Sequence, residues 1–509
     1  MRSVGGMSEK RCVCAARACA WLLQIAKSLA APGLAVASIA GAPAIDEIAW
    51  LKSPSELMPL GLGSAVACSG DGHIAVAGGV DPDLGIDAAA VTVWRCTPHG
   101  ASLADIVWHP TEDARAHFGG ALAFDATGGL LLVGAPHEMG PRAHSQGGWP
   151  GGFQAGSVHV LRRTLPGDPT THRGGWEEIA LLRSKESRSG ATFGAAVAID
   201  GSRILVGSPG HSGSGFAAGF AEVFVAASDG WRHEAALNPS GVASPMGSRV
   251  GSSVALAGRT AAVGAPGHAS SGPSTGCVDI HWRGKNGWTH TSRITSPHAQ
   301  GGGMFGTSLA LDESGVVLAV GAPCETTPGR TESVERGGQV HIFRCVDEET
   351  LAERWELVAT IPAPLRECSV NEARPEAFGM SLAIRDGVLA IGASEACVRA
   401  ESSDGDHAAL GAGAAYVAMI ASDGVVGELV RVTSSHAASE HHDGYRVALG
   451  SIGAGTSGSA TAVLLVGRLG NSDLPPGPGG ATLFALPHAL PSTITHAISP
   501  TQEALAARP

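Results

Sequence analysis

Short apolar runs alternate with glycine-rich or polar turns along most of the chain. One unit makes the order clear: Phe118-Gly119 opens an apolar run, residues 130–136 form a second run ending in Gly-Ala-Pro, and residues 156–161 form a third. A fourth run, residues 176–182, begins with tryptophan and closes the unit. Runs of this length between turn residues are typical of β-strands, so each unit predicts four strands.

The same unit recurs at a spacing of about 60 residues. Five clear copies open with Phe-Gly or Val-Gly at residues 118, 193, 250, 305 and 378, and two degenerate copies begin near residues 62 and 443. Four short strands per repeat are the pattern of a propeller blade. The sequence therefore predicts an all-β fold, a seven-bladed β-propeller of four-stranded blades.

Physical reasons explain why certain residue types recur at fixed positions of the repeat. In Val197-Ala198-Ile199 a small residue stands between branched ones, which suits a sheet buried on both faces. Glycine after the phenylalanine lets backbones approach closely toward the ring axis. The proline of Gly-Ala-Pro has no N–H, so it ends the ladder of the second strand.

The way in which the ring closes is also predicted. Residues 45–53 resemble the fourth strand at residues 177–184 but have no blade before them, and the last repeat lacks a convincing fourth strand. We expect residues 46–52 to be the outermost strand of the seventh blade, which leaves no open sheet edge. Residues 493–498 are the alternative for this strand.

Composition excludes two classes of partner. Lys and Arg number 34 against 46 Asp and Glu, which gives a net charge of −12, and the chain has no basic stripe. Nucleic acid is therefore not expected as a partner. No apolar run reaches the length that a membrane-spanning helix needs, so no integral membrane segment is expected.

The ends of the chain differ from its middle. Residues 1–44 are basic and end in Ala42-Pro43-Ala44, the form of a signal-peptidase site, so we expect a secretory leader and a secreted, extracellular protein. A transit peptide to an organelle and an unprocessed extension are the alternatives. Residues 45–486 are expected to form the propeller, and residues 487–509, rich in Pro and Ala, a disordered tail.

Two long loops on one face of the ring carry the candidate binding residues. Residues 137–155 and 394–412 each follow a second strand, and long loops on a rigid scaffold commonly bind partners. The bland alternative is glycine-rich insertions without function. The candidate partner-binding residues are Arg142, His144, Trp149, Phe153, Arg399, Asp404 and Asp406.

Metal, disulfide and catalytic signals are sparser. His436, His441 and His442 lie in the densest set of possible metal ligands and suit zinc, with a flexible polar loop as the alternative. Strand direction places Cys368 and Cys397 on one face of adjacent blades, so they form a candidate disulfide, with free thiols as the alternative. The sequence has no Gly-x-Ser-x-Gly, no His-Glu-x-x-His and no phosphate-binding loop. Residues 453–458 match Gly-x-Gly-x-x-Gly but precede an expected strand and not a helix, so no cofactor is expected.

These Phe-Gly and Gly-Ala-Pro motifs resemble the FG-GAP repeat, and the array over residues 46–486 is similar to the propeller of integrin α subunits and of integrin-like proteins. The resemblance implies binding of proteins, sugars or matrix through the loops of one face. The chain departs from the family where integrin-type units hold Ca²⁺. The turn between the first two strands lacks Asp-x-Asp-x-Asp-Gly, as Asp200-Gly201-Ser202 shows.

Three functions follow as hypotheses. The first is a non-enzymatic propeller that binds a protein or glycan through its loop-rich face, in adhesion, recognition or scaffolding. The second is a hydrolase with a metal-assisted active site at the propeller funnel, near His441 and His442. The third is a purely structural surface or wall component.

Overall fold

The structure is a computed structural model, and it describes residues 45–52, 62–78, 90–111, 114–140, 152–164, 175–237, 244–326, 337–346, 354–364, 376–402, 405–409, 411–436, 441–452, 460–468, 479–487 and 490. The chain divides into two compact units, Met1–Ala40 and Gly41–Pro509, and the described residues all belong to the second. The expected leader and most of the expected tail lie outside them. Within the described residues, no helix is long and apolar enough to cross a bilayer.

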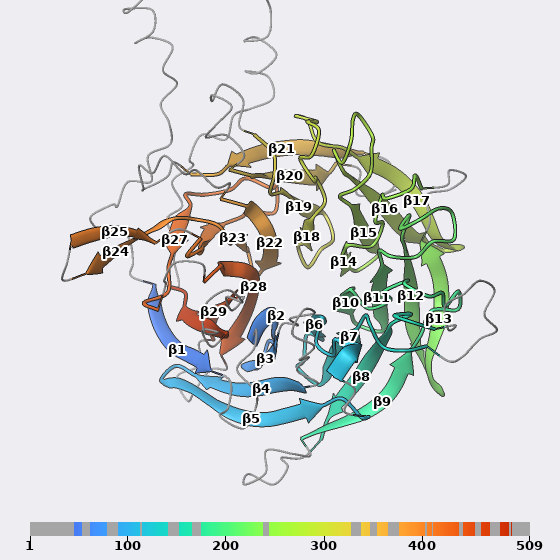
Figure 1. Cartoon of the computed structure of the whole chain (residues 1–509), viewed down its shortest axis with the longest axis horizontal. Coiled ribbons are helices and arrows are strands. Elements are labelled where there is room, and N and C mark those ends of the chain that lie inside the picture. The colour runs from blue at the N-terminus through green and yellow to red at the C-terminus, as the bar shows by residue number, and fades with distance from the viewer. Residues whose placement is uncertain are drawn as a thin grey trace, which may run out of the picture. The chain divides into compact units, whose positions relative to one another are not determined.

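The predicted seven-bladed propeller is confirmed: seven four-stranded antiparallel sheets follow one another around a ring (Figure 1). The first blade holds β2 (Leu62–Cys68), β3 (His73–Gly78), β4 (Ala90–Thr97) and β5 (Gly100–Trp108). The second holds β6 (Ala121–Phe124), β7 (Leu130–Ala135), β8 (Ser157–Arg163) and β9 (Trp176–Leu182), preceded by the 3-10 helix η1 (Ala114–Ala116). The third holds β10 (Ala196–Asp200), β11 (Arg203–Ser208), β12 (Phe220–Ala227) and β13 (Gly230–Leu237).

The remaining blades repeat this order. The fourth holds β14 (Ser253–Ala257), β15 (Thr260–Ala265), β16 (Cys277–Gly284) and β17 (Gly287–Ile294). The fifth holds β18 (Ser308–Leu311), β19 (Val317–Ala322), β20 (Gln339–Cys345) and β21 (Trp355–Pro362). The sixth holds β22 (Phe378–Arg385), β23 (Val388–Ala393), β26 (Ala414–Met419) and β27 (Val430–Val432).

The seventh blade combines strands from both ends of the described chain. It holds β28 (Asp443–Ile452), β29 (Thr461–Arg468), β30 (Gly480–Ala485) and, at its outer edge, β1 (Asp46–Lys52). β1 runs antiparallel to β30 from the pair Asp46 and Ala485 to the pair Lys52 and Gly480. Residues 493–498, the alternative for this strand, lie outside the described residues.

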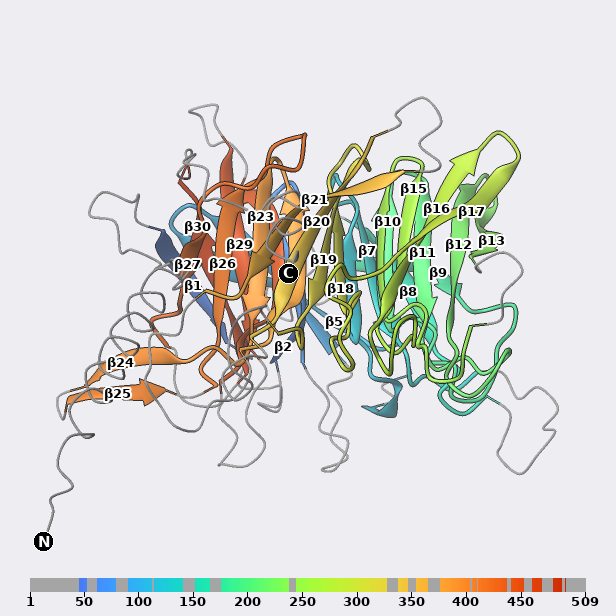
Figure 2. The same ribbon diagram turned by 90° about the horizontal axis from the view of Figure 1, so that it is seen from above.

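One element departs from the sequence-based expectation. Residues 394–412 were expected to be a loop, but β24 (Val398–Ser402) and β25 (Gly405–Ala409) pair there as a hairpin, which projects at the lower edge in Figure 2. Each strand has only five residues, and charged residues occur in both. Such short polar strands carry little apolar periodicity, which is the signal that a sequence pattern depends on.

The core lies between neighbouring blades. All six residues of β15 and all six of β19 are buried, whereas β9 at the rim leaves most of its residues exposed. One apolar cluster joins Val158 of the second blade to Ile204 and Val206 of the third. The inner strands are thus buried on both faces, as the spacing of small and branched residues predicts.

Close contacts between glycine backbones repeat at the junctions between blades. A Cβ on Gly134, the next-to-last residue of β7, would overlap the carbonyl oxygen of Gly194 in the next blade. Gly194 itself has a φ of +92°, which glycine adopts without the cost of a side chain. The same pairing joins Gly207 to Gly251, Gly264 to Gly306, Gly321 to Gly379, Gly392 to Gly444, and Gly467 to Gly63.

Serine hydroxyls fasten three of these junctions. Ser253 Oγ donates to the Gly306 carbonyl at 2.7 Å, and Ser308 Oγ donates to the Gly379 carbonyl at the same distance. Both acceptors belong to the following blade, so each bond crosses the junction. Ser381 Oγ donates in the same way to the Gly444 carbonyl at 3.1 Å.

We expect Gly207→Ala to lower the free energy of unfolding by about 2–3 kcal/mol, because the added methyl group overlaps the Gly251 backbone and forces the blades apart. Gly284→Ala is the matched control, since a Cβ there meets nothing closer than 4.0 Å. The measurement is the urea midpoint of each variant. Equal midpoints for the two variants would contradict the role given to the glycine contact.

Candidate binding face

One end of the blades carries two kinds of segment: those that join second and third strands, and those that join one blade to the next. We call this end the loop face; it is the lower edge in Figure 2, where β24 and β25 project. Short parallel bridges tie the two kinds of segment together, pairing Gly156 with Phe193, Gly219 with Val250, Gly276 with Phe305 and Gly413 with Asp443.

Backbone conformations on the loop face are unusual and repeat from blade to blade. Residues before the first strand of six blades have positive φ although they are not glycine: His117, Thr192, Arg249, Met304, Ala377 and His442. A second such position, in the segment after the second strand, holds Gln154, Ala217 and Ser274. Each left-handed residue of this kind costs about 1 kcal/mol or more, and such residues gather at sites where geometry is functionally constrained. The loop face is therefore the best candidate for a functional surface.

Of the predicted partner-binding residues, the structure describes three. Phe153 is partly exposed on the loop face, and its carbonyl accepts hydrogen bonds from the Gly190 amide at 2.7 Å and from Ser189 Oγ at 3.1 Å. Arg399 lies in β24 and Asp406 in β25, so the hairpin places both in one element. Arg142, His144, Trp149 and Asp404 lie outside the described residues.

Two apolar side chains on this face are more exposed than that of Phe153, and the sequence pattern did not predict them. Phe216 is 74% exposed and Met246 is 72% exposed. The Gly247 amide donates to the Phe216 carbonyl at 2.9 Å, which holds the two segments side by side at the junction of the third and fourth blades. Met139, 45% exposed, lies on the same face at the second blade.

A repeated signal connects Phe216 with Phe153. The sequence Gly-Phe-x-Ala-Gly occurs at residues 152–156 and again at residues 215–219, just before the third strands of two consecutive blades. Both phenylalanine carbonyls accept from a glycine amide of the segment entering the next blade, and both precede a residue of positive φ. The two phenylalanines thus occupy equivalent, fixed positions at consecutive junctions, and comparison of the repeats could have found the second.

A buried polar position lies beneath the loop face. In each blade, one position of the third strand holds a residue that is both polar and buried. This residue pairs with the second-strand residue that lies two positions before the end of its strand. This position pairs with Val133 in the second blade, Val206 in the third, Val263 in the fourth and Val320 in the fifth. Its occupants are Thr92, His159, Glu222, Asp279, His341, Tyr416 and Thr482.

In the second blade this position belongs to a network of charges. His159 Nε2 lies 3.0 Å from Glu138 Oε2, and His159 Nδ1 lies 2.6 Å from Glu178 Oε2. Arg183 Nη2 donates to Glu138 Oε1 at 2.7 Å. Burial alone raises the pKa of Glu138, but hydrogen bonds from His109, His159 and Ser157 outweigh it and hold that pKa well below its ordinary value.

In the next two blades acid and imidazole exchange places. Glu222 and Asp279 take the third-strand position, and His211 and His268 take the place that Glu138 has after the second strand. Arg293 joins the pair in the fourth blade, with Nε 2.8 Å from Asp279 Oδ1 and Nη1 3.1 Å from His268 Nε2. Each of these blades thus retains one acid and one imidazole under the loop face.

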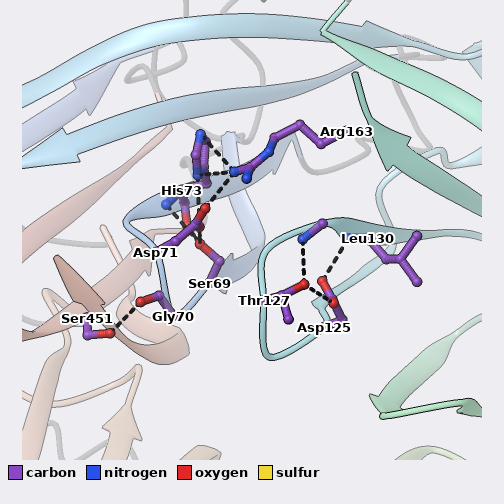
Figure 3. Close-up of polar contacts among 10 residues, drawn as sticks. Ser69, Gly70, Asp71, His73, Asp125, Thr127, Leu130, Arg163 and Ser451 are labelled. Atoms are coloured by element: carbon purple, nitrogen blue, oxygen red, sulfur yellow. Dashed lines mark hydrogen bonds and ion pairs between the residues drawn. The ribbon is translucent and has the colours of Figure 1, made fainter. Parts of the chain in front are cut away.

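At the opposite end of the blades, carboxylates in the turns between first and second strands form a different set of hydrogen bonds and ion pairs (Figure 3). Asp71 Oδ1 accepts from Ser69 Oγ at 2.6 Å and lies 2.9 Å from His73 Nδ1, while Arg163 Nη1 donates to Oδ2 at 2.6 Å. Burial raises the pKa of Asp71, but the bonds from Ser69, His73 and Arg163 together hold that pKa well below its usual range.

Other turns between first and second strands are closed by their own backbones. Asp125 Oδ1 accepts from the Leu130 amide at 2.7 Å, and Asp312 Oδ1 accepts from the Val317 amide at 2.7 Å. These turns stand where integrin-type units carry their calcium ligands. The chain's own amides donate hydrogen bonds to the carboxylate oxygens there.

The histidines predicted as zinc ligands have separate surroundings. His436 stacks on Trp50 with ring centroids 4.9 Å apart and lies 3.3 Å from Glu47. His442 Nδ1 lies 2.9 Å from Glu395 Oε1, and His441 Nδ1 lies 3.2 Å from the His436 carbonyl. In the described part of the chain, the groups with metal-ligand geometry are two others: His109 with Glu138 and His159, and His298 with Glu325 and His341.

The cysteines divide into free and bonded. Cys68, Cys96, Cys277, Cys324 and Cys345 form no disulfide. Cys397 is in a disulfide. Cys368 lies outside the described residues, and the pairing of these two stays a prediction.

The buried Glu222 predicts a pH dependence of stability. Burial raises the pKa of Glu222 to about 7 in the folded protein, above its ordinary value, so ionisation destabilises the fold progressively between about pH 4.5 and pH 7. We expect Glu222→Gln to match the wild type near pH 4.5 and to exceed its free energy of unfolding by up to about 3 kcal/mol at pH 8. Urea midpoints at both pH values are the measurement. Glu177→Gln, at an exposed rim position, is the control, and an equal difference at both pH values would contradict the assignment.

Comparisons with known proteins concern the repeat and the fold. Residues 176–224 match the family model of the FG-GAP repeat. No curated protein matches the chain. Among solved structures, the chain is similar to the WD40 repeats of RRP9, at 10% identity and a TM-score of 0.49, over 87% of this chain and 100% of that one. It is also similar to Sqt1 of Chaetomium thermophilum, at 15% identity and a TM-score of 0.42, over 84% of this chain and 85% of that one.

The repeat that matches the family model spans the last strand of the second blade and the first three strands of the third. The same Phe-Gly and Gly-Ala-Pro turns, or close variants, recur in the other blades and make the glycine contacts between them. The matched repeat and the seven blades together support the resemblance of the chain to FG-GAP repeat propellers.

Proposed function

We propose that this propeller is a non-enzymatic recognition module that binds a protein partner through the loop face of its second, third and fourth blades. The observation that carries the proposal is the set of exposed apolar side chains there: Phe153, Phe216 and Met246. Large apolar side chains this exposed are typical of interfaces, where aromatic residues and methionine are enriched.

Rigid presentation supports the same proposal. The carbonyls of Phe153 and Phe216 are held by amides of the neighbouring blade, and the residues that follow them have fixed left-handed backbones. A preorganised loop loses little conformational entropy when a partner binds, so its contacts convert more fully into affinity. Apolar side chains at the surface favour a protein over a glycan, whose recognition needs more hydrogen-bonding groups.

We also propose that the protein works outside the cytosol, as an adhesion-like or scaffolding component. The basic leader with its Ala42-Pro43-Ala44 ending supports this setting, and so does the disulfide of Cys397, because disulfides persist mainly in oxidising compartments.

We expect the double variant Phe216→Ser with Met246→Ser to weaken partner binding at least ~30-fold, since hot-spot truncations cost about 2 kcal/mol or more. Partners are first captured by the wild type from its native cells after cross-linking, and the affinity of the purified partner for each variant is then measured by calorimetry. The double variant is expected to keep its urea midpoint, because both side chains are exposed.

Leu181→Ser is the control. It also removes an exposed apolar side chain, but this side chain lies on the rim strand β9 and not on the loop face. Unchanged affinity in the double variant, or equal losses in both variants, would refute the loop face as the binding surface. Binding to a glycan array that survives the double variant would replace the protein partner with a glycan.

A further inference from the structure

The fifth blade contains a second group of buried polar residues, which is separate from the proposed partner-binding surface. Glu325 follows β19, His341 lies in β20, and His298 lies in the segment that enters the blade after β17. Glu325 and His341 are both 0% exposed, and His298 is half-buried. One ligand atom from each residue lies within 4.8 Å of the others.

Hydrogen bonds at the far ring nitrogens orient both imidazoles. His298 Nδ1 lies 3.2 Å from Gln339 Oε1, while Gln339 Nε2 donates to the Thr326 carbonyl at 2.9 Å. Because that amide oxygen can only accept, His298 Nδ1 carries the proton, and in the neutral ring Nε2 holds the lone pair. His341 Nδ1 lies 3.1 Å from Thr360 Oγ1, and its Nε2 lies 2.7 Å from Glu325 Oε2.

The carboxylate is engaged on one oxygen. Oε2 faces His341, while Oε1 is buried and has no hydrogen-bond partner among the described residues. Leaving a buried carboxylate oxygen without a donor is costly. A cation bound between the carboxylate and the imidazole lone pairs would satisfy that oxygen.

The second blade offers an internal comparison with His109, Glu138 and His159. Glu138 and His159 occupy the positions of Glu325 and His341, while His109 lies in the segment that enters the blade, two residues after Val107, and His298 lies four residues after the equivalent Ile294. In that blade Arg183 donates to Glu138 Oε1 and supplies a positive charge. The residue at the corresponding place in the fifth blade is Pro362, which follows Ile361 as Arg183 follows Leu182. The fifth blade therefore keeps the acid and both imidazoles but lacks the arginine.

The orientation of His109 differs as well. Its Nδ1 accepts from the Thr111 amide at 3.3 Å, so in the neutral ring the proton lies on Nε2, the nitrogen that faces Glu138. That tautomer offers no lone pair to an ion. Of the two groups, only the fifth-blade one combines two oriented imidazole nitrogens with a carboxylate oxygen that lacks a donor among the described residues.

We propose that His298, Glu325 and His341 bind one divalent transition-metal ion of the Zn²⁺ type. Two imidazoles and one carboxylate are a common zinc ligand set, and imidazoles held through their other nitrogen are the usual supporting arrangement. Three protein ligands leave a tetrahedral ion one further position. The ion stands in the fifth blade where the Arg183 guanidinium stands in the second.

The test uses the full-length protein, stripped with a chelator and titrated with Zn²⁺ by calorimetry, with bound metal counted after gel filtration. The wild type is expected to bind Zn²⁺ with micromolar or tighter affinity and to gain several degrees in Tm when saturated. His298→Ala should weaken binding at least ~10-fold and remove that gain in Tm. Glu325→Gln keeps the shape of the buried side chain and should have the same effect.

His109→Ala, in the corresponding group of the second blade, is the control and should leave the affinity unchanged. A wild type that binds no Zn²⁺ would overturn the proposal, as would a His298→Ala variant with the same affinity and metal count. Zn²⁺ that is lost with His441→Ala and His442→Ala, but not with His298→Ala, would overturn it in favour of that other histidine group. None of these results depends on the partner-binding proposal, because no partner is present in the assay.

Discussion

The fold depends on one repeated interaction: the backbone contact between a glycine next to the end of the second strand of one blade and a glycine near the start of the first strand of the next. A side chain at Gly134 or Gly207 would overlap a carbonyl of the neighbouring blade. Because neither partner carries a Cβ, two sheets approach closely enough for their apolar faces to interlock. The seventh blade meets the first by the same contact, between Gly467 and Gly63, so the described residues show one local rule at six junctions of the ring.

The loop face follows from this contact. Once the glycines fix the distance between blades, the segments just beyond them must turn within a short span, and non-glycine residues such as Thr192 and Ala217 take left-handed conformations there. The parallel bridges then hold each segment against its neighbour. As a result, Phe153 and Phe216 lie at equivalent places on consecutive junctions, and their apolar side chains are exposed there.

Much of the architecture could be predicted from the sequence because it is encoded in repeats. Strand number, blade number and burial on both faces follow from periodic apolar runs that each blade repeats.

The candidate sites were harder to predict from the sequence, for physical reasons. His298, Glu325 and His341 come from three different segments, and their meeting depends on packing between blades. Phe216 lies in a glycine-rich stretch without apolar periodicity, and only the match of residues 215–219 to residues 152–156 marks it. The hairpin of β24 and β25 is too short and too polar to give a pattern.

The exchange of acid and imidazole between blades has a consequence for how such repeats diverge. In the second and fifth blades the acid follows the second strand and histidine lies on the third, whereas the third and fourth blades have the reverse. A single replacement at either position would leave two acids or two imidazoles together in a buried space, at a cost of several kcal/mol. Copies of the repeat can therefore drift apart at these positions only by double replacements or through a neutral intermediate. Thr92, Tyr416 and Thr482, which hold the equivalent place in the remaining blades, are residues that such an intermediate would contain.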